Sequence, residues 1–202
     1  PSCAAIGGGH PFPYRIEYMP GLPEGVWHWS LLNYCTDYVS AVYEYWLHTG
    51  DLETVGQLWP CLQRLLRFLR EDVDPERAKP LEDFETDFSN LNDTVSGGFQ
   101  SRTVLCMGFC EAWRDGARLA EALGEIETGA LLQEAYAADV SRVRRAAWDD
   151  KREVFVDGDR VSWRANAQSV LAGVTPAGAP ARELLERVSA IPDAIRPVAG
   201  NA

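Results

Sequence analysis

The sequence predicts an all-α fold of about three helical hairpins, with one small β-hairpin near residues 153–163. Apolar residues recur at helical spacing in paired segments, and a short turn separates the two members of each pair. The pairs begin near residues 30, 101 and 164, so the unit recurs every ~60–70 residues, whereas common solenoid repeats measure roughly 33–47. Large hairpins joined by long loops indicate half of a toroid, with the loops gathered at one mouth.

The first helix is predicted over residues 30–49. Apolar side chains cover most of its circumference and leave only a narrow polar stripe, which is typical of a helix buried on most sides. Tyr38, Tyr45 and Trp46 follow the helical spacing, so we expect all three in the core.

The turn after this helix has specific end signals. Gly50 suits the left-handed position that follows a helix, and Asp51 suits the cap of the next one. The second helix is predicted over residues 52–70 with one apolar side. Pro60 is expected to kink this helix or to delay its start.

The other two hairpins follow the same plan. The second is predicted from helices over residues 101–123 and 126–148, separated by Gly124, and the third from helices over 164–172 and 180–190. Three tryptophans are assigned to packing between hairpins: Trp59, Trp113 and Trp148.

The predicted β-hairpin centres on Asp157-Gly158-Asp159, which has strand–turn–strand chemistry on both sides. Two aspartates also suggest calcium. A calcium loop of the EF-hand kind, however, needs alternating oxygen ligands that end in a bidentate glutamate at position 12. A turn is therefore the better interpretation.

Charge excludes some partners. The 202 residues include 30 acidic and 19 basic ones, a net charge of −11, which argues against nucleic acid or an anionic membrane surface. No apolar run approaches the ~18 residues of a membrane span. Because the chain starts at Pro1 without a methionine or a signal-like segment, we interpret it as a piece of a longer protein. Its compartment and oligomeric state stay open.

The cysteines do not predict a metal site. Cys106 and Cys110 lie four residues apart on one predicted helix face, but the nearest histidines lie in other segments. Small buried apolar side chains are the better interpretation of this pair. The sequence also contains no phosphate-binding loop and no dinucleotide fingerprint. We therefore predict no metal and no cofactor.

Several stretches, in their order along the chain, resemble the bacterial α-L-rhamnosidases, and in particular their six-hairpin (α/α)6 catalytic domain. The stretches are Trp29–Leu32, Tyr45–Glu53, Leu58–Pro60, Leu65–Leu69, Trp113–Gly124, Val156–Gly158, Ala165–Ala167 and Leu171–Pro176. The resemblance covers about residues 20–180. It implies that residues 1–202 are a fragment of a single such domain.

The resemblance implies an inverting glycoside hydrolase that removes terminal α-L-rhamnose from glycosides or polysaccharides. Such an enzyme uses two carboxyl groups about 6.5–9.5 Å apart. In the family, the acid precedes the part that matches residue 20 and the base follows the part that matches residue 176. We therefore assign no catalytic residue, and we expect the fragment alone to be inactive.

The two long loops, over residues 1–29 and 71–100, hold the predicted sugar-binding residues. Aromatic rings suit the C–H face and the methyl group of a deoxy-sugar, and carboxylates bind its hydroxyl groups. Trp29 matches a family tryptophan, and Phe88 stands where many relatives have a tryptophan. The predicted residues are Trp27, Trp29, Asp83, Glu85, Asp87 and Phe88.

Other interpretations stay open. The loop tryptophans also suit hydrophobic plugs, and the acidic residues suit a solvated loop. The protein could be another toroid glycosidase with a different sugar specificity. It could also be a non-catalytic helical-hairpin module that binds carbohydrate or protein, although such a module predicts repeats of about 34 residues. An isolated half-ring would expose apolar faces, so we expect aggregation or partial unfolding on expression.

Overall fold

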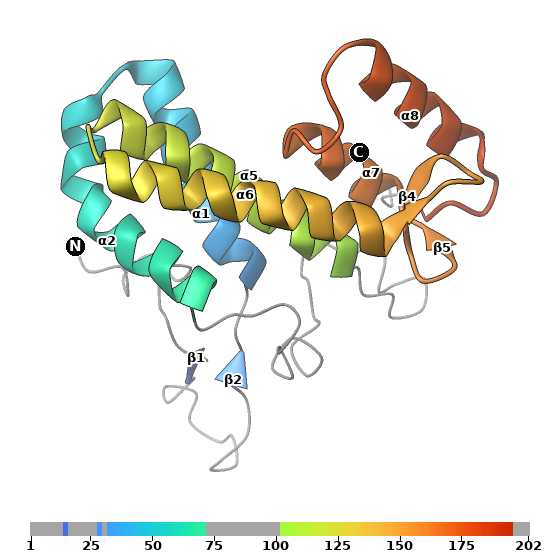
Figure 1. Cartoon of the computed structure of the whole chain (residues 1–202), viewed down its shortest axis with the longest axis horizontal. Helices are drawn as coiled ribbons and strands as arrows, with labels where there is room; N and C mark the ends of the chain where they lie inside the picture. The colour runs from blue at the N-terminus through green and yellow to red at the C-terminus, as the bar shows by residue number, and fades with distance from the viewer. Residues whose placement is uncertain (1–13, 16–27, 30–31, 72–101, 196–202) are drawn as a thin grey trace, which may run out of the picture.

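The computed structural model describes residues 14–15, 28–29, 32–71 and 102–195 (Figure 1). This part of the chain is all-α, with short strands at two places. Its helices are α1 (Leu32–Thr49), α2 (Leu52–Glu71), α5 (Arg102–Ala122), α6 (Ile126–Ala147), α7 (Trp163–Leu171) and α8 (Ala179–Ala190). Each predicted helix is present, with ends within two residues of the prediction. Among these helices, none combines the length and the apolar composition needed to cross a membrane.

The strands form two small antiparallel sheets. The first pairs β1 (Tyr14–Arg15) with β2 (His28–Trp29). The second has the order β3-β4-β5, with β3 at Trp148–Asp149, β4 at Val154–Asp157 and β5 at Arg160–Val161. The predicted β-hairpin is therefore confirmed, and it gains a third strand.

The third strand corrects the prediction for Trp148. Helix α6 ends at Ala147, and Trp148 takes an extended conformation opposite Phe155 of β4. The Asp149 carboxylate then accepts hydrogen bonds from the backbone N–H groups of Lys151 and Arg152, at 2.9 and 3.0 Å, which turns the chain into β4. Trp148 is 37% exposed, in contrast to the buried Trp59 and Trp113, and its ring packs against Phe155 of β4.

The turn between α1 and α2 has the predicted form. Gly50 has a φ of +69° and donates its N–H to the carbonyl of Trp46 at 2.7 Å. One oxygen of Asp51 accepts the N–H of Thr54 at 3.0 Å, and the other accepts the Thr54 hydroxyl at 2.6 Å. These bonds, the one from the Thr54 hydroxyl foremost, lower the pKa of Asp51 to about 2. The cap places the start of α2 at Leu52, so Pro60 does not delay the helix but lies inside it.

Burial of α1 is less complete than predicted. Cys35, Val39 and Val42 are buried and Tyr38 packs against them, but Tyr45 is 40% exposed and Leu47 54%. Tyr45 donates its hydroxyl to Asp51 at 2.6 Å and so braces the turn rather than filling the core. The reason is that, within the described residues, α1 packs mainly against α2 and α5 and leaves its other side uncovered.

Helix α5 is the centre of the fold, because it contacts α1, α2, α6 and α7 (Figure 1). One face of α5 places Phe109 and Trp113 in a core shared with α1, α2 and α6. Another face places Met107 and Cys110 in a second core, shared with α6, β4, α7 and α8. Burial raises the pKa of the Cys110 thiol, as expected for a small apolar side chain in a core.

Among the first helices of the three hairpins, α5 contacts both α1 and α7. The β-hairpin is fixed to the start of α5. Asp157 accepts the N–H of Thr103 at 2.7 Å, and the Thr103 hydroxyl donates to the carbonyl of Val156 at 2.9 Å. Asp157 therefore acts as a cap for α5 from a position 54 residues away.

Candidate functional site

The predicted sugar-binding residues lie almost wholly outside the described part of the chain. Trp27, Asp83, Glu85, Asp87 and Phe88 are all in undescribed segments. Trp29 is the last residue of β2, and its backbone lies opposite Tyr14. The six assignments therefore remain predictions.

The segment that matches the family at Ala165–Ala167 has a structural role. Asn166 is fully buried, and its side-chain oxygen accepts the N–H of Phe155 at 2.8 Å. Its amide group donates to the carbonyls of Phe155 at 2.9 Å and of Ser162 at 2.8 Å. This fully buried side chain binds β4 to the first turn of α7, and both N–H groups of its amide are used in doing so.

A group of charged side chains between α1, α5 and α7 is the candidate site in the described residues. Glu111 and Asp115 are four residues apart on α5, so they share one face, and Arg114 lies beside them. Gln168 reaches this face from α7, and Ser40 reaches it from α1. We call these five residues the carboxyl cluster.

Arg114 organises the cluster. Its guanidinium contacts Asp115 through two nitrogens, each 2.8 Å from the same carboxylate oxygen, and lies 3.8 Å from a carboxylate oxygen of Glu111. It also donates to the backbone carbonyl of Leu171 at the end of α7. The other oxygen of Glu111 accepts a hydrogen bond from the Gln168 amide. The cluster thus binds α7 to α5 through two separate bonds.

Arg118 extends the cluster toward α1. It donates to the hydroxyl of Tyr43 at 2.9 Å, and its guanidinium lies 5.4 Å from the centre of that ring. It is also 4.0 Å from Asp115, at the limit of an ion pair. The bond to Tyr43 therefore connects α5 to α1, as the bonds of Gln168 and Arg114 connect it to α7.

Burial changes the acidity of both carboxyl groups. The side chain of Glu111 is 18% exposed, and burial, aided by the nearby Asp115, raises its pKa to about 7 against the opposing effect of Arg114. Burial also raises the pKa of Asp115, although Arg114 partly offsets this. Glu111 can therefore hold or release a proton near neutral pH. Catalytic acid–base groups have this property, and so do buried carboxyl groups with a structural role.

Sequence reasoning missed this cluster. The sequence predicts a helix over residues 101–123, but periodicity alone gives Glu111 and Asp115 no role. One feature of the sequence could have indicated the cluster. Glu111 and Asp115 lie four residues apart, with Arg114 between them, in a helix segment that is otherwise mostly apolar.

Within the described residues, no group of three or more His, Cys, Asp or Glu side chains is placed to hold a metal ion. No protein-family model matches the chain, and no curated protein matches it either. A solved structure matches the chain.

The chain shares its fold with part of a rhamnosidase. The similar structure is the GH78 family rhamnosidase of Bacillus sp. GL1, with a TM-score of 0.63 and 19% sequence identity. The match covers 84% of this chain and 18% of that protein, so this chain spans less than a fifth of its relative's length. At this identity the likeness shows the fold alone. It agrees with the all-α hairpin architecture predicted from the sequence.

Proposed function

We propose that residues 1–202 form part of one (α/α)6 catalytic domain, in an inverting glycoside hydrolase that removes terminal α-L-rhamnose from glycosides or polysaccharides. The observation that carries the proposal is the fold likeness to a rhamnosidase over 84% of this chain. The contacts of α5 with both α1 and α7 support the proposal, because consecutive hairpins of a toroid pack side by side.

The helix ends support the placement of the predicted sugar-binding residues. The start of α1, the end of α2 and the start of α5 lie on the same side of the molecule (Figure 1). Trp27 and Trp29 precede the first of these ends, and Asp83 to Phe88 fall between the other two. We propose that these loop residues meet at one mouth and bind the sugar there.

We assign the carboxyl cluster a positioning role in this domain. Both oxygens of Glu111 face partners, Gln168 on one side and Arg114 on the other. The acid and the base of the reaction belong to segments beyond this chain, as the family resemblance implies. The cluster would fix α1, α5 and α7 relative to one another, and with them the spacing of the loops at the mouth.

The test is hydrolysis by a longer polypeptide that contains this chain and its flanking sequence. We expect release of nitrophenol from 4-nitrophenyl α-L-rhamnoside, with the β-anomer of rhamnose as the first product by proton NMR. Trp29→Ala is expected to lower kcat/KM about tenfold through the lost ring contact, and Trp29→Phe less. Preference for a different aryl glycoside would support another toroid glycosidase. Sugar binding without hydrolysis would support the binding module.

A further inference from the structure

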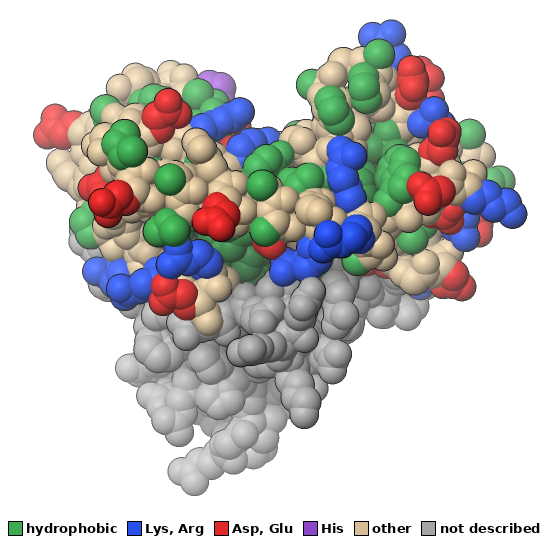
Figure 2. Space-filling view, in the orientation of Figure 1, with side chains coloured by type: hydrophobic (Ala, Val, Ile, Leu, Met, Phe, Trp, Pro, Cys, Tyr) green, Lys and Arg blue, Asp and Glu red, His purple; other side chains and the backbone are tan. Residues whose placement is uncertain are grey.

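We propose that the groove between α6 and α8 binds a single neutral sugar ring, at a site separate from the predicted mouth. The groove has a volume of about 260 Å³ and is lined by residues of α6, α8, the β3–β4 strands and the α7–α8 turn. The surface is hollowed there, and hydrophobic side chains lie beside Lys or Arg side chains (Figure 2). None of the predicted sugar-binding residues lines this groove, and binding there involves no catalysis.

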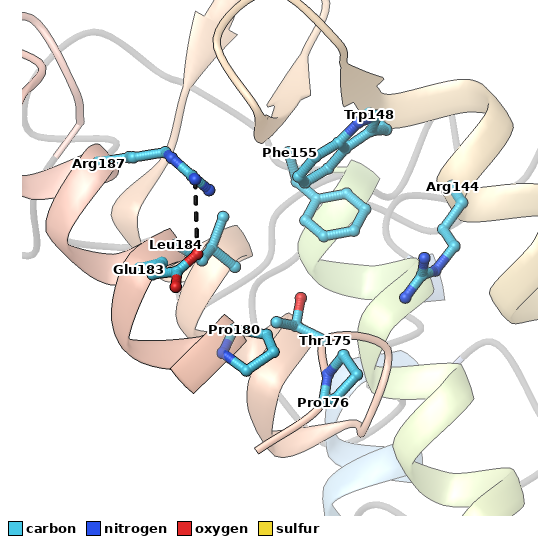
Figure 3. A pocket seen from close by; sticks show the side chains of 9 residues that line it. All are labelled: Arg144, Trp148, Phe155, Thr175, Pro176, Pro180, Glu183, Leu184 and Arg187. Carbon is cyan, nitrogen blue, oxygen red and sulfur yellow. Dashed lines mark ion pairs between the residues drawn. The ribbon is translucent and has the colours of Figure 1, made fainter. Parts of the chain in front are cut away.

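An exposed indole forms one wall of the groove. Trp148 is 37% exposed, whereas Trp59 and Trp113 are 4% and 3% exposed. Its ring packs against the buried Phe155 at 5.0 Å between centroids and an angle of 68°, so it is held in place. Figure 3 shows the two rings on the same side of the groove, across from Pro176 of the α7–α8 turn and Pro180 of α8. An ordered indole with an accessible surface suits the apolar face of a sugar ring.

Hydrogen-bonding groups stand on both sides of the indole. Arg144 projects from α6, while Glu183 and Arg187 project from α8 (Figure 3). Arg144 uses one nitrogen for the carbonyl of Val174. Arg187 lies 3.6 Å from Glu183 and 3.1 Å from Glu153. Guanidinium groups offer several further donors, and a carboxylate offers further acceptor positions, so sugar hydroxyls can both accept and donate here.

The charge balance favours a neutral ligand. Two arginines stand against two carboxylates, Glu183 and Glu153, and Arg187 is already paired with both. A phosphate or carboxylate ligand would compete with these pairs rather than fill an unmatched positive site. The volume is slightly below the roughly 300–1,000 Å³ of most small-molecule sites, which leaves room for about one ring and not for a peptide helix.

Arg187 pairs with Glu153 of the β3–β4 turn, where the backbone is unusual. Among the described residues, Glu153 is the one non-glycine residue with a positive φ, at 54°. This conformation is unfavourable for a residue with a side chain, and it persists where surrounding structure holds it. The Glu153 carboxylate lies 3.1 Å from the Arg187 guanidinium.

The test uses fluorine NMR of the whole chain labelled with 5-fluorotryptophan, or of a longer polypeptide that includes it. The chain has seven tryptophans, and the spectrum of Trp148→Phe identifies the Trp148 signal. Methyl α-L-rhamnoside and methyl α-D-glucoside are titrated separately. At least one is expected to shift that signal in a saturable way, with a Kd on the order of 1 mM for a ligand of this size.

Calorimetric titration of variants completes the test. Trp148→Ala is expected to weaken binding at least tenfold, and Trp148→Phe about threefold, while Ile126→Ala at the other, exposed end of α6 keeps full affinity. Trp29→Ala leaves the groove unaffected, which separates this site from the proposed mouth. Circular dichroism confirms that each variant is folded. The proposal is overturned if neither glycoside moves the Trp148 signal, if Trp148→Ala binds as wild type, or if only phosphate or a proline-rich peptide binds.

Discussion

Replacing Glu111 with glutamine is expected to remove a pH dependence of stability that arises in the carboxyl cluster. Burial raises the pKa of Glu111 from about 4.5 to about 7 in the folded protein. Between these values the folded state holds a proton that the unfolded chain has released. The free energy of unfolding is therefore highest below about pH 4.5, where Glu111 is protonated in both states. It falls as pH rises from about 4.5 to about 7.

The size of the effect follows from the width of the window. Each pH unit inside it changes the free energy of unfolding by about 1.4 kcal/mol, so the upper limit is about 3 kcal/mol. The Glu111 side chain is 18% exposed, so solvent screening reduces the energy below this limit. We therefore expect about 1.5 kcal/mol between pH 5 and pH 8. Glu111→Gln keeps an oxygen that can accept from Gln168, so packing against α7 should persist.

The assay is urea unfolding of three proteins at pH 5 and at pH 8: wild type, Glu111→Gln and Glu121→Gln. Glu121 is exposed on the same helix and serves as the matched control. Wild type and Glu121→Gln should lose about 1.5 kcal/mol more than Glu111→Gln over this interval. Equal losses in all three proteins would refute the argument that burial of Glu111 controls this pH dependence.

Three further substitutions test the packing. Asn166→Ala should lower the free energy of unfolding by about 2–4 kcal/mol in urea titrations, because two buried backbone groups of β4 lose their partner; a loss under 1 kcal/mol would contradict it. Asp157→Ala should cost about 1 kcal/mol, and amide exchange should accelerate in the first turn of α5 rather than elsewhere. Gly116→Ala should lower the melting temperature by a few degrees, since the added methyl would lie 3.1 Å from the nearer methyl carbon of Leu66; an unchanged melting temperature would show that this leucine moves freely.

Local patterns were sufficient for the helices and their ends. The cap at Asp51 and the left-handed Gly50 depend on neighbours within a few residues, so both were predictable and both are confirmed. The same holds for the turn at Gly158, whose φ is +62°. Periodicity also identified the three helix pairs, and the fold likeness to a rhamnosidase agrees with that architecture. The sugar-binding residues in the loops stay predictions.

The candidate site could not be predicted from local patterns as the helix ends were, because contacts between residues distant in the sequence create it. Glu111 meets Gln168 and Arg114 meets Leu171, each pair 57 residues apart, and only this packing buries the carboxyl group that then titrates near neutral pH. Trp148 continues a helical pattern in the sequence, yet pairing with β4 extends it beside the α6–α8 groove. Periodicity determined which segments are helices. The tertiary packing alone decided which charges lose their water and which aromatic ring keeps contact with it, because burial depends on neighbours that local sequence does not specify.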